Sequence, residues 1–180
     1  MLIQKHWQRL ILTIAVIAIV QVACGQQYTR VKLSGYSMKP NFTDGDMFVI
    51  EEVHLADLKR GDLVLIENDG NVFIKRLIGL PNETISIRDG KVFINGVVLE
   101  EPYEVVPPLY NIDEIKLDND SYYILGDNRP DSSDSHSWGP VNGDAIKGKA
   151  TPELVFVVST AVFCFGQQCL CNTKTPTDNL

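Results

Sequence analysis

Two short segments of the sequence carry the residues best suited to nucleophilic chemistry. Ser37 lies in SGYSMKP, among glycine and proline residues typical of turns, and Lys75 interrupts the apolar run VFIKRLI. A serine hydroxyl is a weak nucleophile until a neighbouring base accepts its proton, and a neutral lysine is that base in one group of serine hydrolases. Ser37 is therefore either an ordinary turn residue or the nucleophile of a serine–lysine pair.

The environment of Lys75 decides whether it can act as a base. In an extended strand, alternation places Lys75 on the same face as Phe73 and Leu77. One interpretation is an edge lysine whose stem covers apolar surface while its ammonium stays in water. The other is a partly desolvated lysine, whose pKa falls towards neutrality because burial disfavours the charged form. The residues alone leave both interpretations open.

A third motif, GDNRPDSSDS at residues 126–135, completes an ordered set that covers most of residues 31–150. This set resembles the type I signal peptidase (leader peptidase) family of serine–lysine dyad proteases, which remove signal peptides from exported proteins. The matching positions are Ser37-Met38-x-Pro40, Lys75-Arg76-x-x-Gly79-x-Pro81 and Gly126-Asp127-Asn128-Arg129-x-x-Ser132-x-Asp134-Ser135, flanked by Arg60-Gly61-Asp62 and Trp138-Gly139-Pro140-Val141.

The resemblance implies the roles of the site residues. Ser37 is expected to be the nucleophile and Lys75 the general base of a hydrolase that forms an acyl-enzyme and uses no cofactor. Ser132 is expected to orient Lys75 through a hydrogen bond. The supporting residues Asp127, Arg129 and Asp134 are expected to hold their loop against the strand that carries Lys75.

The oxyanion of such a reaction needs hydrogen-bond donors, and the backbone N–H of Ser37 is the expected one. A second donor is not evident, because Gly35 has no hydroxyl and the reach of Ser34 stays open. The departures from the family pattern include two single residues. Asn41 stands where threonine is common, and His136 stands where arginine is usual, so that a pair with Asp134 carries both charges only at lower pH.

The resemblance also implies the substrate: a preprotein signal peptide, cut after small residues in the A-x-A pattern. Such a substrate calls for shallow apolar pockets and an extended segment that adds to an exposed sheet edge. Met38 and Phe42 lie beside the serine, and they either reach the membrane interface or pack in the core.

Composition excludes several other classes of function. The chain has 180 residues and a formal net charge of −7, without a basic stripe or a glycine-rich phosphate loop, which argues against nucleic acid and nucleotides as partners. The three histidines are scattered, and Arg129 interrupts the acidic cluster of Asp127, Asp131 and Asp134. We therefore expect no metal site.

The N-terminus indicates export. Lys5 and Arg9 precede an apolar run, so residues 1–9 are expected to be a cytoplasmic leader and residues 10–24 a transmembrane signal-anchor. A removed signal peptide and a lipoprotein signal acylated at Cys24 are the alternatives. The expected location is the plasma membrane, in contact with lipid, as a single-pass protein whose catalytic domain lies on the exported side.

Residues 151–180 form a C-terminal tail of uncertain role. Its apolar part, Leu154–Phe165, is short for a membrane span and suits a buried strand or an interfacial segment. The other three cysteines, Cys164, Cys169 and Cys171, lie in this tail and pair only in an oxidising compartment.

The middle of the chain has the period-two pattern of strands. Asp89-Gly90 and Asn95-Gly96 are hairpin signals, since both pairs accept positive φ angles. We expect a mostly β fold, a compact antiparallel sheet or barrel-like peptidase domain over residues 27–150. The expected strands are Met47–Glu51, Asp62–Ile66, Asn71–Ile78, Thr84–Arg88, Lys91–Ile94, Val97–Leu99 and Ser121–Leu125.

Two other classes of protein could carry the same motifs. One is a non-catalytic exported β-domain that binds a peptide or partner. The other is a self-cleaving transcriptional repressor, which shares the serine–lysine device. The apolar leader, the acidic charge and the lack of a helix-turn-helix segment argue against the repressor.

Overall fold

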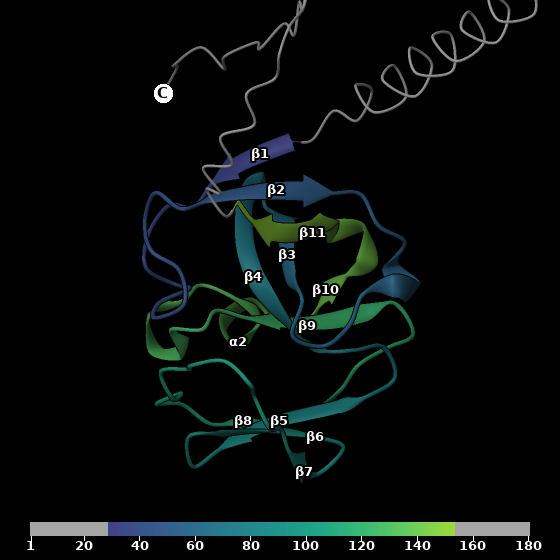
Figure 1. Ribbon diagram of the computed structural model, residues 1–180. Helices are drawn as coiled ribbons and strands as arrows, with labels where there is room; N and C mark the ends of the chain where they lie inside the picture. Colours follow the sequence, from purple (N-terminus) through teal and green to yellow (C-terminus); the bar gives the residue numbers. More distant parts are fainter. Residues whose placement is uncertain (1–28, 154–180) are drawn as a thin grey trace, which may run out of the picture.

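Two antiparallel β-sheets make up the part of the chain that the computed structural model describes, residues 29–153 (Figure 1). The mostly β prediction is confirmed. The expected leader, the expected membrane segment at residues 10–24 and the apolar run 154–165 lie outside the described residues. Among residues 29–153, no helix is long and apolar enough to span a membrane.

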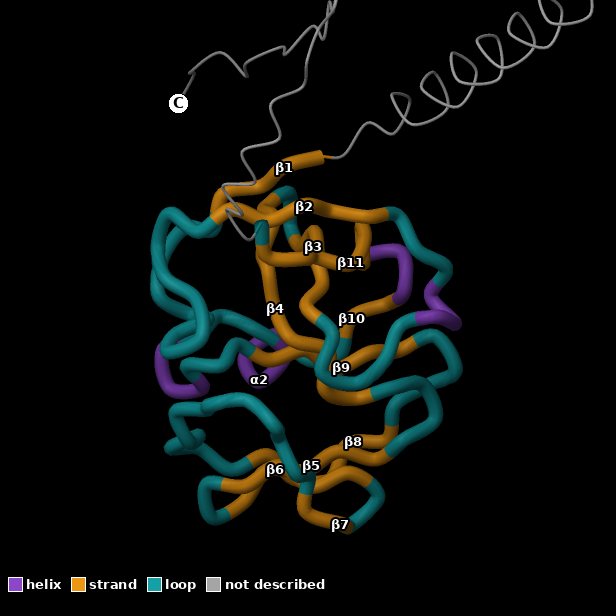
Figure 2. The backbone as a smooth tube through the Cα atoms, in the orientation of Figure 1, coloured by secondary structure: helices purple, strands orange, loops and turns teal. Residues whose placement is uncertain are grey.

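The larger sheet has seven strands in the order β1-β2-β11-β3-β4-β9-β10. Strand β4 pairs with β3 along its first part and with β9 along its last part, from Arg76 to Gly79, so it connects β9 and β10 to the rest of the sheet (Figure 2). The strands are β1 (Thr29–Lys32), β2 (Met47–Glu51), β3 (Leu63–Asn68), β4 (Asn71–Gly79), β9 (Ser121–Leu125), β10 (Val141–Asn142) and β11 (Ile146–Pro152).

The smaller sheet has the order β7-β6-β5-β8, formed by β5 (Thr84–Arg88), β6 (Lys91–Ile94), β7 (Val97–Val98) and β8 (Ile112–Lys116). Its two hairpin turns are the predicted ones. Asp89 and Gly90 have φ angles of 51° and 72°, and Asn95 and Gly96 have φ angles of 50° and 78°. Positive φ at both central residues matches the twist of the flanking strands, which confirms the hairpin prediction.

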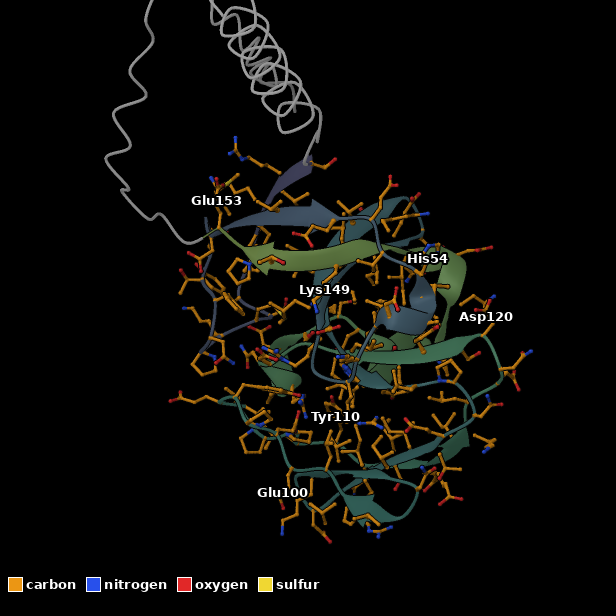
Figure 3. The ribbon with its side chains drawn as sticks, turned by 45° about the vertical axis from the view of Figure 1, so that its right-hand side comes forward. His54, Glu100, Tyr110, Asp120, Lys149 and Glu153 are labelled. Atoms are coloured by element: carbon orange, nitrogen blue, oxygen red, sulfur yellow. The ribbon has the colours of Figure 1, made fainter. Side chains whose placement is uncertain are left out.

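Apolar side chains fill three cores, two of them against the larger sheet and one between the sheets. The third core joins Ile78 and Leu125 of the larger sheet to Ile85 and Ile87 of the smaller one. Side chains occupy the space between the two sheets, where Tyr110 lies (Figure 3). The small sheet is therefore packed onto the end of β4 and β9.

Helical elements are short and lie in connections: η1 (Leu55–Asp57), η2 (Arg129–Asp131), α2 (Ser135–Trp138) and η3 (Gly143–Ala145).

Each of the seven predicted strands is present, four of them with the predicted bounds. The predicted Asp62–Ile66, Asn71–Ile78 and Val97–Leu99 need correction to the bounds of β3, β4 and β7. Asp62 accepts a hydrogen bond from the Lys59 N–H, so it closes the turn before β3.

Four strands were not predicted: β1, β8, β10 and β11. In β8, the apolar residues Ile112 and Ile115 are three positions apart, yet they pair with Ile87 and Ile85, because the ladder shifts register there. In β11, two of the inward positions are Gly148 and Ala150. A bulge in β8 and small residues in β11 hide the alternation that identifies a strand.

Candidate active site

Ser37 lies in the connection between β1 and β2, in a turn closed by a hydrogen bond from the Lys39 N–H to the Tyr36 carbonyl, 3.1 Å. The neighbouring Met38 is fully buried in a core with Leu33 and Phe48. This burial excludes the expected alternative in which Met38 reaches the membrane interface. The methionine instead fixes the turn to the sheet.

Lys75 lies on β4 with its side chain in the protein interior, 2% exposed. Its Nζ donates a hydrogen bond to Ser37 Oγ at 2.7 Å. The ammonium is also 5.8 Å from the centre of the Phe73 ring, which places Lys75 and Phe73 on the predicted common face. The interpretation of Lys75 as a solvated edge lysine is wrong, because almost none of the side chain meets water.

Burial lowers the pKa of Lys75 from 10.5 to about 8. The carboxylates of Asp134 and Asp127 act in the opposite direction, since a nearby negative charge favours the ammonium. Desolvation is the larger effect. Lys75 therefore has an appreciable neutral fraction at mildly alkaline pH, and its nitrogen touches a serine hydroxyl.

Arg76 points to the opposite face of β4 and binds the third motif. Its Nε and Nη2 donate to Asp127 Oδ1 and Oδ2 at 2.7 Å and 2.6 Å, and Nη1 donates to the Gly61 carbonyl at 2.9 Å. The guanidinium also lies 3.7 Å from the centre of the Tyr103 ring. Lys75 thus contacts the serine turn, and Arg76 contacts the loop after β9, because the side chains of consecutive strand residues point to opposite faces.

Asp134 and Arg129 hold the backbone of that same loop. The buried Asp134 accepts hydrogen bonds from the Gly126 N–H at 2.8 Å and from the His136 N–H at 3.0 Å. Arg129, also buried, donates to the Gly126 carbonyl at 3.0 Å and pairs with Glu101. Asp127 is thus the supporting residue that reaches the Lys75 strand, while Asp134 and Arg129 shape the loop.

His136 lies close enough to pair with Asp134 in the way expected from the sequence. Its Nδ1 is 2.8 Å from Asp134 Oδ1. The imidazole also stacks on the Tyr110 ring with 4.2 Å between ring centres.

Ser132 differs from the expectation. Its hydroxyl is buried and has no hydrogen-bond partner within the described part of the chain, and Lys75 directs its hydrogen bond to Ser37 instead. The Ser132 Oγ lies directly against Gly126. A Cβ added at Gly126 would collide with this hydroxyl and would come within 2.5 Å of the Ser37 carbonyl oxygen. Ser132 therefore borders the site through Gly126 without binding Lys75.

The segment between β7 and β8, residues 99–111, was missed as part of the site. Its Val106 N–H donates to the Asp127 carbonyl at 3.0 Å, and its Glu104 carbonyl accepts from the Asn41 amide at 2.7 Å. Glu101 and Tyr103 contact Arg129 and Arg76 as described above. The segment has no periodic pattern. The signal in the sequence that could have identified it is its length, because long connections without secondary structure are uncommon in compact domains and often carry functional residues.

A cavity of about 180 Å³ opens beside Lys75. Its lining is mostly apolar and comes from the end of β1, the following Ser34, and β3 and β4: Val31, Lys32, Leu33, Ser34, Leu65, Val72, Phe73, Ile74 and Lys75. Drug-sized ligands occupy pockets of about 300–1,000 Å³, so this hollow suits one or two small side chains.

Strand β4 has a free edge beside this cavity. Residues 71–75 pair with β3 on one side, whereas pairing with β9 on the other side begins only at Arg76. Within residues 29–153, no strand covers the second side of 71–75. Unpaired backbone groups of this kind can accept an additional strand.

Two of the three acidic residues of the third motif are engaged inside the protein, Asp127 by Arg76 and Asp134 by the loop backbone, whereas Asp131 is exposed. Across residues 29–153, no group of three or more His, Cys, Asp or Glu side chains could hold a metal ion.

A β-domain in which a buried lysine contacts a turn serine has the arrangement of the serine–lysine class of hydrolases. The sequence model of the family described as signal peptidase, peptidase S26, matches residues 4–155. The chain belongs to this family.

Several relatives have similar sequences. A probable signal peptidase I-2 of Synechocystis is 38% identical over 124 residues, 63% of this chain and 57% of the relative. A signal peptidase I of Leptolyngbya laminosa is 39% identical over 126 residues, 63% of this chain and 62% of the relative. A signal peptidase I of Bacillus licheniformis is 36% identical over 139 residues, 69% of this chain and 74% of the relative. The chain thus spans less than two thirds of the first two relatives.

A crystal structure of a signal peptidase I from Enterococcus faecalis is 30% identical, with a TM-score of 0.46 over 53% of this chain and 97% of that one.

Proposed function

We propose that this chain is a membrane-bound signal peptidase I, a serine endopeptidase that removes N-terminal signal peptides from exported preproteins. Ser37 is the nucleophile and Lys75 the general base. The observation that carries the proposal is the hydrogen bond between Lys75 Nζ and Ser37 Oγ, with 2.7 Å between the two atoms and the lysine buried. Membership of the peptidase S26 family and relatives named signal peptidase I support it.

The reaction begins with neutral Lys75. With a pKa of about 8, about a quarter of the lysine is neutral at pH 7.5. The lysine nitrogen takes the hydroxyl proton of Ser37 while Oγ bonds to the scissile carbonyl carbon. The resulting ammonium then gives this proton to the leaving amine as the peptide bond breaks. Water, deprotonated by the same lysine, hydrolyses the acyl-enzyme and restores the serine.

The oxyanion formed in each step binds the backbone N–H of Ser37. This N–H donates to no acceptor within residues 29–153, so it is free for a substrate oxygen. A preorganised donor of this kind contributes about 10²–10³ in rate in other serine hydrolases. Ser34 lines the same cavity as Lys75, which makes its hydroxyl the candidate for a second donor.

The substrate lies as an extended strand along the free edge of β4. Backbone hydrogen bonds to residues 71–75 supply affinity, and the adjoining cavity selects the side chains that enter it. The small, mostly apolar cavity suits alanine-sized side chains, in agreement with cleavage after A-x-A sites.

The other predicted site residues support the pair. Asp127, Arg129 and Asp134 keep the loop after β9 in place, and Asp127 reaches β4 through Arg76. Ser132 does not bind Lys75 in the free protein, but its buried hydroxyl has no partner there and can accept a hydrogen bond from the Lys75 ammonium once Ser37 Oγ is bonded to the substrate carbon.

Membrane attachment completes the proposal. Residues 1–9 stay in the cytoplasm, residues 10–24 span the plasma membrane, and the peptidase domain, residues 27–150, faces the exported side. Anchoring suits the substrate, since a signal peptide is itself held in the bilayer by its apolar segment. Residues 151–180 have no role in this proposal.

Cleavage of a preprotein tests the function directly. The full chain in detergent is incubated with a preprotein that has an A-x-A site, and the new N-terminus of the product is sequenced. Ser37→Ala and Lys75→Ala should abolish cleavage, with losses of several orders of magnitude. Lys149→Ala is the matched control, because Lys149 lies on β11 of the same sheet, paired with Asp62 at 2.7 Å.

Two results would overturn the proposal. One is cleavage by Lys75→Ala at the rate of the parent protein. The other is the absence of cleavage by the parent, which would favour a non-catalytic domain that only binds peptides.

A further inference from the structure

Asn41 connects the serine turn to the residues that hold the Lys75 strand. The half-buried side chain lies four residues after Ser37 in the same turn region. Its Nδ2 donates to Asp127 Oδ2 at 2.8 Å and to the Glu104 carbonyl at 2.7 Å. An amide nitrogen has two hydrogens, and both have an acceptor here.

Asp127 Oδ2 is shared by two donors from different parts of the chain. Arg76 Nη2 approaches it at 2.6 Å from β4, one residue from Lys75, and Asn41 Nδ2 approaches it from the serine turn. Both donors meet one oxygen of a fully buried carboxylate, where hydrogen bonds are stronger than in water. The positions of the turn and of β4 are therefore tied to a single atom.

A backbone hydrogen bond also connects the loop after β9 to the serine turn. The Asn128 N–H donates to the Ser37 carbonyl at 2.9 Å, and Asn128 follows Asp127 directly. The loop after β9 thus holds the serine turn at Ser37 and again at Asn41. Asn128 Nδ2 also donates to the Tyr36 carbonyl at 3.3 Å, so this loop holds the turn at Tyr36, Ser37 and Asn41. Within residues 29–153, the Asn41 amide is the attachment to this loop on the C-terminal side of Ser37, and it restrains the turn from rotating about the Tyr36–Ser37 backbone.

We infer that Asn41 is a positioning residue, whose amide holds the Ser37 hydroxyl at the distance at which Lys75 can take its proton. The inference rests on the proposed function. Asn41 touches neither Lys75 nor the cavity beside it, so its loss should lower the rate of the chemical step and leave substrate binding unchanged. A displacement of about 1 Å at a reacting atom costs about 10²-fold in rate.

Two variants separate the effect of the hydrogen bonds from the effect of charge. Asn41→Ala removes both donors. Asn41→Asp keeps the shape of the side chain, removes both donors and places a carboxylate against Asp127. We expect kcat to fall at least 10-fold in Asn41→Ala and further in Asn41→Asp, with KM within about twofold of the parent value.

Ser133→Ala is the matched control. The Ser133 hydroxyl accepts a hydrogen bond from Trp138 Nε1 at 3.1 Å in the same loop region, with no link to the serine turn. This variant should keep the parent kcat. All variants are measured as full chains in detergent with the A-x-A preprotein, well below their melting temperatures, and the folded fraction is determined by circular dichroism.

The outcomes distinguish this inference from the proposed function. If the parent chain cleaves and the Asn41 variants keep its kcat, or lose affinity through KM alone, Asn41 has no positioning role and the peptidase proposal stands. A lower melting temperature with the parent kcat would assign Asn41 a purely structural role and overturn the inference. If the parent chain does not cleave, the proposed function fails, and the inference fails with it.

Discussion

The Nζ of Lys75 lies 2.7 Å from the Oγ of Ser37, although 38 positions separate the two residues in the chain. The lysine comes from the middle of a strand and the serine from a turn, and the lysine is almost fully buried. Contact with the hydroxyl and desolvation of the amine are the two conditions under which a lysine serves as the base for a serine. Four predictions test this arrangement and its supports.

The pH dependence of cleavage should follow Lys75. Because desolvation lowers its pKa to about 8, activity should rise with a midpoint near pH 8 as the ammonium loses its proton. A pH profile of kcat/KM measures this midpoint in the free enzyme. A flat profile between pH 7 and pH 9 would contradict the role of Lys75 as a base.

Replacement of Lys75 by methionine should stabilise the folded protein at pH 7. The pKa of Lys75 is about 8 in the folded protein and 10.5 in the unfolded chain, so the unfolded chain binds the proton more tightly. Below pH 8 the folded protein must therefore bury a charged lysine, which lowers its free energy of unfolding. We expect Lys75→Met to gain about 1–2 kcal/mol at pH 7, after allowance for the lost hydrogen bond.

The gain in stability from Lys75→Met should shrink as the pH rises from 8 to 10.5, because Lys75 is then buried as a neutral amine and its desolvation no longer destabilises the folded protein. Urea unfolding at several pH values measures it. Lys149→Met is the control, since Lys149 is 38% exposed and paired with Asp62, and no gain is expected there. An equal gain in both variants would show that the effect is not specific to the buried lysine.

The buried pair of Arg76 and Asp127 should be essential for stability. Asp127→Ala leaves the Arg76 guanidinium buried without its carboxylate, and loss of one partner of a buried pair costs about 3–5 kcal/mol. Arg30→Ala is the control, because Arg30 is 64% exposed in its pair with Glu153, and such pairs contribute about 0–1 kcal/mol. Chemical denaturation measures both. Similar losses in the two variants would be evidence against a special role for the buried pair.

A side chain at Gly126 should displace the serine turn. The added Cβ of Gly126→Ala collides with Ser132 Oγ and comes within 2.5 Å of the Ser37 carbonyl, so cleavage should fall at least 10-fold. Gly96→Asn is the control, since Gly96 has open space around it and its φ of 78° is one that asparagine tolerates. Parent-like cleavage by Gly126→Ala would mean that the turn adjusts without loss.

Much of this architecture could be predicted from local patterns. The hairpins at Asp89-Gly90 and Asn95-Gly96 depend on φ angles that the two residues themselves prefer, and strands such as Met47–Glu51 and Ser121–Leu125 show a clear apolar pattern. The strand β8 could not be found in this way, because a bulge places its apolar residues Ile112 and Ile115 three positions apart and breaks the period-two pattern.

The sequence by itself determined the residue types of the site, the order of its motifs and the face of β4 on which Lys75 lies, because these depend on chain order and strand alternation. Only the tertiary structure decided that Lys75 is desolvated, that it binds Ser37 and not Ser132, and that Asn41 and Arg76 share one oxygen of Asp127. Solvent exclusion and distances between residues far apart in the chain arise only when the strands pack, and no local pattern encodes them.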